Sequence, residues 1–67
     1  MDEYAINQRG GNDVLCRWDG QKWQALAWAE ETDGEWYVSD GDRQILIGDR
    51  GDAVDHLWNN RQTGGIE

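Results

Sequence analysis

The chain has 67 residues, and its fourteen acidic and six basic side chains give a net charge of −8 at pH 7. A charge of this sign is repelled by nucleic acid and by anionic membrane surfaces, and it is attracted to basic protein surfaces. The composition therefore argues against direct nucleic-acid binding and membrane attachment. It predicts a basic protein surface as the partner, such as that of a nucleic-acid-binding protein.

The length predicts a single small domain over 1–67. Cys16 is the only cysteine, which excludes an internal disulfide and fits a reducing compartment. The N-terminus lacks the basic and apolar regions of a signal peptide. We therefore expect a cytoplasmic protein, located in the cytoplasm of the host cell if a phage encodes it.

The first part of the chain, residues 1–12, is polar and ends in two glycines, which predicts a loosely held N-terminal arm. Beyond it, short apolar stretches are separated by the dipeptides Asp19-Gly20, Asp33-Gly34 and Asp40-Gly41, which favour tight hairpin turns. Three turns predict four strands in a β-meander over 14–47. The expected strands cover about 14–18, 22–30, 35–39 and 43–47.

The segment 21–31 is ambiguous, because its Ala, Leu, Gln, Lys and Glu residues are good helix formers. The register across the turns favours a strand instead. If Asp33 and Gly34 are the two central turn residues, Ala29 lies opposite Val38; across the next turn, Trp36 lies opposite Ile45. Trp18 lies opposite either Gln21 or Trp23. Side-chain alternation then gives the sheet one shared apolar face: Val14, Cys16, Trp18, Trp23, Ala25, Ala27, Ala29, Trp36, Val38, Ile45 and Ile47.

A helix over 52–62 is expected to cover this face, with Asp52 as its N-cap and Leu57 and Trp58 closing the core. The pair Gly64-Gly65 predicts the end of the helix and a frayed C-terminus. The predicted fold class is α+β, an antiparallel four-stranded β-meander with one C-terminal helix packed on one face.

The carboxylates of this arrangement gather at the ends of the sheet. One end carries Asp19, Asp40 and Asp42. At the other end we expect a partner-binding group of six acids: Glu30, Glu31, Asp33, Glu35, Asp49 and Asp52. Alternate residues on a strand are about 7 Å apart, so such carboxylates form a row comparable in spacing to phosphates. Two alternatives stay open, namely acids that merely solvate the turns and an adaptation to high salt in a halophile.

The second face of the sheet carries an apolar group in which Trp28 and Tyr37, with Leu26 and Leu46, are candidate binding anchors. The N-terminal arm, through Tyr4 or Ile6, is an alternative cover for this group. A homodimer formed through the same face is a third interpretation.

No pattern in the chain predicts catalysis. His56 lies beside Asp55 without a nearby nucleophile, and Cys16 is expected to be a buried thiol. The spacing of four aspartates does not match a calcium loop: Asp40, Asp42, Asp49 and Asp52. We therefore expect no enzyme, no metal site and no cofactor.

A small acidic chain of this kind resembles, as a physical class, phage-encoded inhibitors that occupy the nucleic-acid sites of host defence complexes. The leading functional hypothesis is such an inhibitor, of the anti-CRISPR or anti-restriction type, which acts by nucleic-acid mimicry. The alternative is a small accessory interaction module or homodimer that uses the apolar sheet face.

Overall fold

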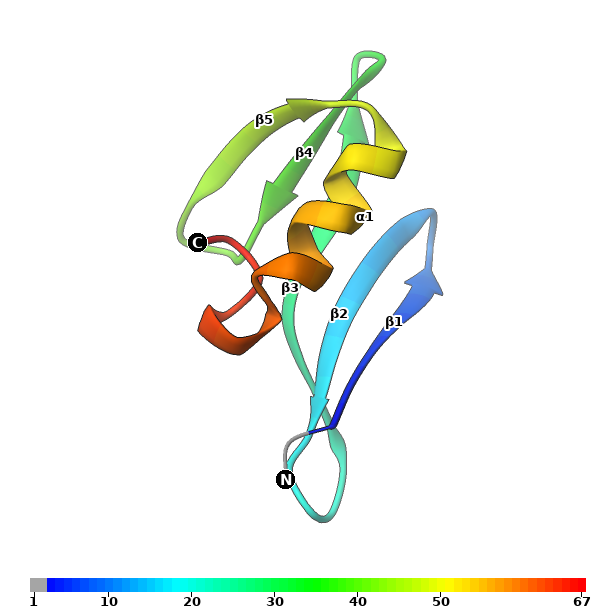
Figure 1. Ribbon diagram of the computed structural model, residues 1–67. Coiled ribbons are helices and arrows are strands. Elements are labelled where there is room, and N and C mark those ends of the chain that lie inside the picture. The colour runs from blue at the N-terminus through cyan, green and yellow to red at the C-terminus, as the bar shows by residue number, and fades with distance from the viewer. Residues whose placement is uncertain (1–2) are drawn as a thin grey trace.

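The computed structural model describes residues 3–67 and shows an antiparallel sheet with one helix across one face (Figure 1). The sheet has five strands in the order of the sequence. They are β1 (Glu3–Arg9), β2 (Asn12–Trp18), β3 (Trp23–Thr32), β4 (Glu35–Ser39) and β5 (Gln44–Gly48), followed by helix α1 (Arg50–Asn59) and the short 3-10 helix η1 (Arg61–Thr63). The α+β class and the C-terminal helix are confirmed, but the prediction of four strands is wrong by one.

The additional strand comes from the segment predicted as a loose arm. Glu3–Arg9 pairs with β2 along its whole length, from Glu3 opposite Trp18 to Arg9 opposite Asn12. Gly10 and Gly11 connect the two strands with φ angles of 57° and 86°, the positive values that a type I′ hairpin turn requires at both positions. The polar composition of this strand suits an edge strand, and that composition concealed it in the sequence.

The ambiguous segment 21–31 is extended, since β3 spans Trp23–Thr32. The predicted pairing of Ala29 with Val38 is confirmed. Asp33 and Gly34, with φ angles of 53° and 84°, form the expected two-residue turn. In this segment the pattern of apolar side chains across the sheet therefore overrides the helix propensity of the individual residues.

The other two Asp-Gly dipeptides, at 19–20 and 40–41, begin longer turns that have the same hydrogen bonds. The amide of Asp19 donates to the carbonyl of Lys22, and the amide of Asp40 donates to that of Arg43, at 3.0 and 3.2 Å. Each aspartate also accepts, through Oδ1, the backbone N–H groups two and three residues further along the chain, at 2.8 to 2.9 Å. The longer turn places Val38, and not Trp36, opposite Ile45.

These hydrogen bonds predict a pH-dependent contribution to stability. The pKa of the Asp19 carboxyl is lowered most by a hydrogen bond from the side chain of Gln24. The hydrogen bonds from the backbone N–H groups lower it further. In Asp40, the backbone N–H groups of Arg43 and Asp42 lower the pKa in the same way. An acid whose pKa is lower in the folded state stabilises the fold above its unfolded pKa of about 3.9, and this contribution is lost as the pH falls through the folded pKa.

We therefore expect Asp40→Ala to unfold at a lower temperature than the native chain at pH 7. The difference should shrink as the pH falls below about 4, because the carboxyl of the unfolded chain takes up a proton there before that of the folded chain does. Thermal unfolding followed by circular dichroism at both pH values measures this. A difference that is the same at pH 7 and at pH 3 would contradict the role assigned to the turn carboxylates.

The core between the sheet and α1 differs from the predicted apolar face at β2. The register shifts between Leu15 and Cys16, so that Leu15 lies opposite Ala27 while Cys16 lies opposite Ala25. This β-bulge turns Leu15, rather than Val14 or Cys16, toward the helix. The helix-side core comprises Leu15, Ala27, Ala29, Val38, Ala53, Leu57 and Ile66, with Trp36, Ile45 and Ile47 packed at its edge.

Helix α1 begins earlier than predicted, because Asp49 is its N-cap. The Asp49 side chain accepts the amide of Asp52 at 2.9 Å, so Asp52 lies in the first turn instead of capping it. The helix also ends earlier, at Asn59. Within residues 3–67, no helix has the length and apolar character needed to cross a membrane.

The C-terminus returns to the core and is not frayed. Gly64 and Gly65 have φ angles of 93° and 88°, and Ile66 beyond them is 2% exposed. The ring Nε2 of His56 lies 3.1 Å from the carbonyl oxygen of Ile66. Gly65 is therefore buried beside the core, and it also lies just after the last helical residues.

Candidate partner-binding surface

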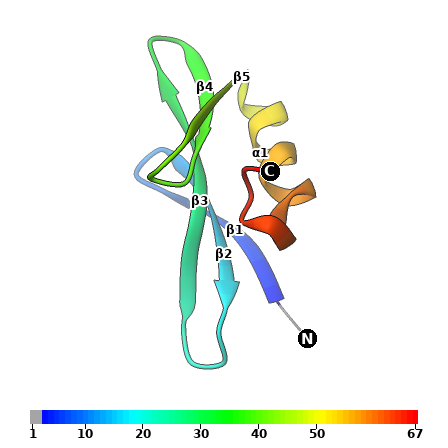
Figure 2. The same ribbon diagram turned by 90° about the vertical axis from the view of Figure 1, so that its left-hand side faces the viewer.

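Five exposed carboxylates meet at one end of the molecule, which we call the acidic end: Glu31, Asp33, Glu35, Asp49 and Asp52. Glu31 and Glu35 lie beside the turn between β3 and β4, Asp33 lies in that turn, and the other two lie where β5 passes into α1. Figures 1 and 2, which differ by a quarter turn, both show these two places at the upper end of the molecule. The structure therefore brings together five of the six predicted acidic residues.

Two of the basic side chains, those of Arg43 and Arg50, form ion pairs away from Glu31, Asp33 and Glu35. Arg50, at the start of α1, forms a bidentate ion pair with Asp13. Its Nε donates to Oδ2 at 2.8 Å and its Nη2 donates to Oδ1 at 3.0 Å. Asp13 is 4% exposed, and its hydrogen bond to the guanidinium raises the pKa of Arg50. Arg43 pairs with Asp40 and Glu67. As a result, Glu31, Asp33 and Glu35 have no ion-pair partner among residues 3–67.

Crowding of like charges is visible at Asp52. A hydrogen bond with the carboxyl of Asp49 and the negative charge of Asp49 raise the pKa of Asp52, and Asp55 adds to the effect. A raised carboxyl pKa means that ionisation is opposed by the neighbouring anions. The acidic end therefore carries electrostatic repulsion that a cationic partner would relieve.

Glu30, the sixth predicted acid, differs from these five because it is half-buried and its carboxylate is hydrogen-bonded within the sheet. It pairs with Tyr37 across the sheet and, by alternation with the buried Ala29, lies on the face opposite α1. Its carboxylate accepts the indole N–H of Trp28 at 2.9 Å and the side-chain amide of Gln44 at 2.8 Å. Glu30 thus holds neighbouring side chains of the sheet in place.

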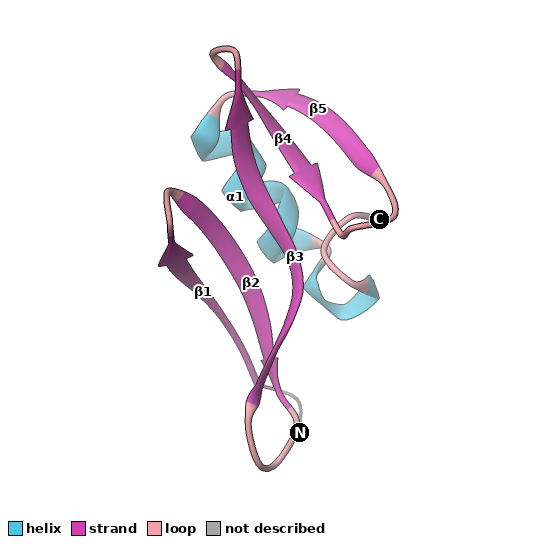
Figure 3. Cartoon of the chain, turned by 180° about the vertical axis from the view of Figure 1, so that it is seen from behind, coloured by secondary structure: helices cyan, strands magenta, loops and turns pink. Residues whose placement is uncertain are grey.

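The face opposite α1, which we call the uncovered face, is seen from behind in Figure 3. Trp28 and Tyr37 lie on it and are half-buried, whereas Leu46, opposite Tyr37, is 55% exposed. Leu26, predicted on the same face, packs instead against the helix-side core. The bulge beside Leu15 accounts for this change of side, because it leaves Leu26 as the extra residue of β3.

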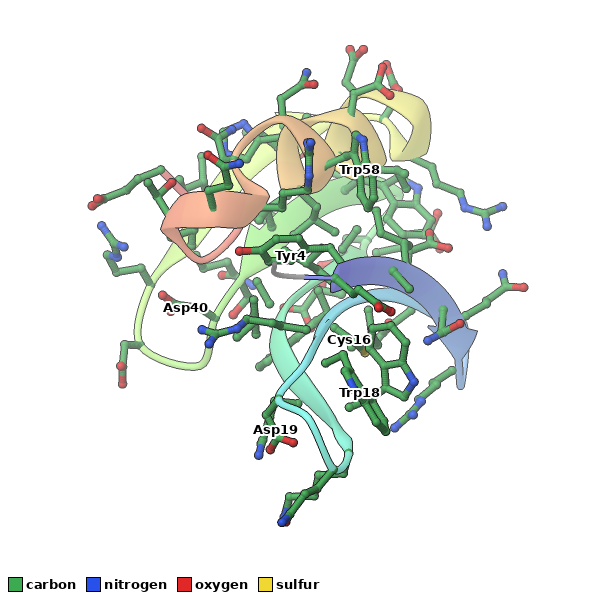
Figure 4. All side chains as sticks on the ribbon, turned by 60° about the horizontal axis from the view of Figure 1, so that its bottom comes forward. Tyr4, Cys16, Trp18, Asp19, Asp40 and Trp58 are labelled. Carbon is green, nitrogen blue, oxygen red and sulfur yellow. The ribbon has the colours of Figure 1, made fainter. Side chains whose placement is uncertain are left out.

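Two aromatic arrangements were not anticipated from the sequence. Trp58, predicted in the core, is 40% exposed, and the guanidinium of Arg61 lies 4.4 Å from the centre of its ring. The i, i+3 spacing of these residues within the predicted helix was the available signal. Trp18 and Trp23 contact one another with ring centres 5.5 Å apart. Figure 4 shows Trp18 and Cys16 on the uncovered side of the sheet, with Tyr4 on the side of the helix.

Within residues 3–67 no group of three or more potential metal ligands is found, and no pocket is present. The exposed groups that the described chain offers to a partner are thus the acidic end and the apolar group on the uncovered face. Comparison with known proteins finds no family model that matches the chain, and no curated protein or solved structure with significant similarity to it.

Proposed function

We propose that this chain is a small acidic inhibitor that binds the nucleic-acid site of a basic protein, as a mimic of the nucleic acid. A defence complex of the CRISPR or restriction type is the class of target that this chemistry fits. The observation that carries the proposal is the acidic end, where exposed carboxylates lie together without basic partners among residues 3–67. Such a surface is complementary to a groove lined with Lys and Arg.

The arrangement of the carboxylates at the acidic end suits a partner that surrounds the tip of the hairpin. Glu31 lies on β3 and Glu35 on β4, on either side of the tight turn at Asp33. Glu31 is paired with Trp36 and Glu35 with Thr32, so alternation places the two carboxylates on opposite faces of the hairpin end, where a basic groove that surrounds this end contacts both.

Tyr37 is the better of the two proposed apolar anchors. It lies two residues from Glu35 along β4, whereas Trp28 pairs with Ser39 at the far end of that strand. The indole N–H of Trp28 is also occupied by Glu30. A partner that covers the acidic end could therefore reach Tyr37 across the edge of the same hairpin.

A second candidate function is an accessory interaction module that uses the uncovered face. The exposure of Leu46 beside Tyr37 favours it, because exposed apolar groups next to aromatic side chains are common in interfaces. In this case binding would depend on Leu46 and Tyr37 and would be indifferent to the acidic end.

Charge reversal distinguishes the two functions. We expect Glu35→Lys to weaken binding to the basic partner by about tenfold at low salt, because it places a cation where the partner presents cations. Asp42→Lys is the matched control, since it changes the net charge equally but lies in the turn between β4 and β5. Affinities of the native chain and both variants, measured by titration against the partner, test this.

Equal losses in the two variants would indicate a general charge effect and contradict a specific acidic site. Binding that survives Glu35→Lys but is abolished by Leu46→Ala or Trp28→Ala would favour the accessory module.

A further inference from the structure

The edge strand β1 offers a pairing surface that does not involve the acidic end. β2 is its neighbour in the sheet, and the opposite side of β1 is the edge. The seven residues of β1 pair with β2 in unbroken register, without a bulge. Edge strands are usually protected by bulges, prolines or covering elements, because their free backbone groups pair readily with another strand.

The backbone groups that β1 directs outward follow from the hairpin. Arg9 and Asn12 flank the two-residue turn, and in such a hairpin this flanking pair is hydrogen-bonded. Alternation along the ladder then directs the N–H and C=O groups of Tyr4, Ile6 and Gln8 toward the edge. Three consecutive outward positions are enough for a short antiparallel ladder with a second strand.

The sequence of β1 is complementary to itself in the antiparallel direction. With Ile6 of one copy opposite Ile6 of another, all seven positions find a partner, and Glu3 of each copy lies opposite Arg9 of the other. Both charged side chains are exposed and form no ion pair within residues 3–67. Oppositely charged pairs across antiparallel strands are stabilising, and like charges in the same positions are destabilising.

Other registers are less favourable. Centring the pairing on Ala5 or on Asn7 removes the contact of Glu3 with Arg9, and parallel pairing sets Glu3 beside Glu3. The symmetric register also brings the half-buried Ile6 side chains of the two copies together. The charge pattern therefore favours a second copy of the chain as the strand that pairs with β1. It also favours the register in which Ile6 lies opposite Ile6.

We propose that the protein forms a two-fold symmetric dimer through antiparallel pairing of β1 with β1 of a second copy. The two sheets join into one continuous sheet, and both acidic ends stay free. This inference is independent of the proposed inhibitory function, because it uses neither the acidic end nor the uncovered face.

A charge-swap series measured by sedimentation equilibrium tests the dimer. Glu3→Arg and Arg9→Glu each create two like-charged pairs at the interface, so each should raise the dimer dissociation constant by about tenfold. The double variant restores opposite charges and should return the constant to near the native value. Both side chains are exposed, so thermal unfolding at a concentration where the chain is monomeric serves as the control for folding.

The series separates local pairing from general repulsion. Glu3→Arg lowers the net negative charge and Arg9→Glu raises it, so a general charge effect would change dimerisation in opposite directions. A native chain that stays monomeric up to about 1 mM would overturn the proposal. Single variants that dimerise as well as the double variant would overturn it too.

Disulfide formation tests the register. Ala5 of one copy is expected opposite Asn7 of the other in a non-hydrogen-bonded pair, where Cα atoms are about 4.5 Å apart and a disulfide fits. In a Cys16→Ala background, a mixture of Ala5→Cys and Asn7→Cys chains should form a mixed disulfide dimer under mild oxidation. Each variant alone should form little. Equal cross-linking in the single-variant samples would contradict this register.

Discussion

Replacing Gly65 with alanine should cost about 2 to 5 kcal/mol of folding free energy. The backbone there has a φ of 88°, a left-handed conformation that costs an L-residue roughly 1 to 2 kcal/mol. An added Cβ would also lie 2.7 Å from Cδ2 of Leu15 and 3.3 Å from both Cβ of Ala27 and Cδ2 of Leu57. Overpacking of this kind costs typically about 1 to 3 kcal/mol.

Urea unfolding of Gly65→Ala measures this loss, and Gly64→Ala provides a matched control. Gly64 has a similar φ of 93°, but nothing lies within 4 Å of its added Cβ. The control should therefore show the backbone cost alone, about 1 to 2 kcal/mol. Domains of this length are stable by roughly 3 to 10 kcal/mol, so Gly65→Ala should leave the chain close to unfolding. Equal losses at the two positions would contradict the packing of the C-terminal residues against the sheet.

The second large effect is expected at Leu57. Its side chain is 0% exposed and lies in the core between α1 and the sheet. Leu57→Ala should cost about 2 to 5 kcal/mol, because it removes buried methyl groups and leaves a cavity.

The neighbouring Trp58 provides the comparison, because its side chain is 40% exposed. Although tryptophan is larger, Trp58→Ala should cost less than Leu57→Ala, about 1 kcal/mol, by removing the contact with Arg61. Both variants are compared by urea unfolding. A larger loss for Trp58→Ala would show that this residue belongs to the core, as the sequence alone had indicated.

Local turn chemistry and alternation predict much of the sheet. The pair Asp33-Gly34 sets the register between β3 and β4, and it leads to the observed pairing of Ala29 with Val38. The same reasoning recovers the strand at 23–32 against its helix propensity. These features are predictable because they depend on residues that are close in the sequence.

The remaining features depend on contacts that a one-dimensional pattern does not show. The bulge at Leu26 breaks the alternation of β3, so that Leu15 of β2 lies opposite Ala27 in the core, and Leu26 itself packs against that core. β1 is polar and becomes a strand because β2 offers it a free edge. Asp49 rather than Asp52 caps the helix, because the chain leaves β5 directly into α1.

The acidic end was predictable to a similar degree. Its location follows from the meander and from the turn residues, so Glu31, Asp33, Glu35, Asp49 and Asp52 were identified correctly as neighbours. The hydrogen bonds of Glu30 with Trp28 and Gln44 could not be predicted, because they depend on the register of three strands. The ion pair of Arg50 with the buried Asp13 likewise could not be predicted from the sequence, since the two residues are far apart in it.

The central claim, that the acidic end replaces a nucleic acid in a basic site, is tested most directly by capture from a bacterial lysate. The tagged chain and its Glu35→Lys variant are used as bait, and bound proteins are eluted with increasing salt or with competing DNA or RNA. We expect the native chain to retain a nucleic-acid-binding protein that salt and nucleic acid both release, and the variant to retain much less of it. A partner that resists both salt and nucleic acid, and that binds the variant equally well, would contradict the claim.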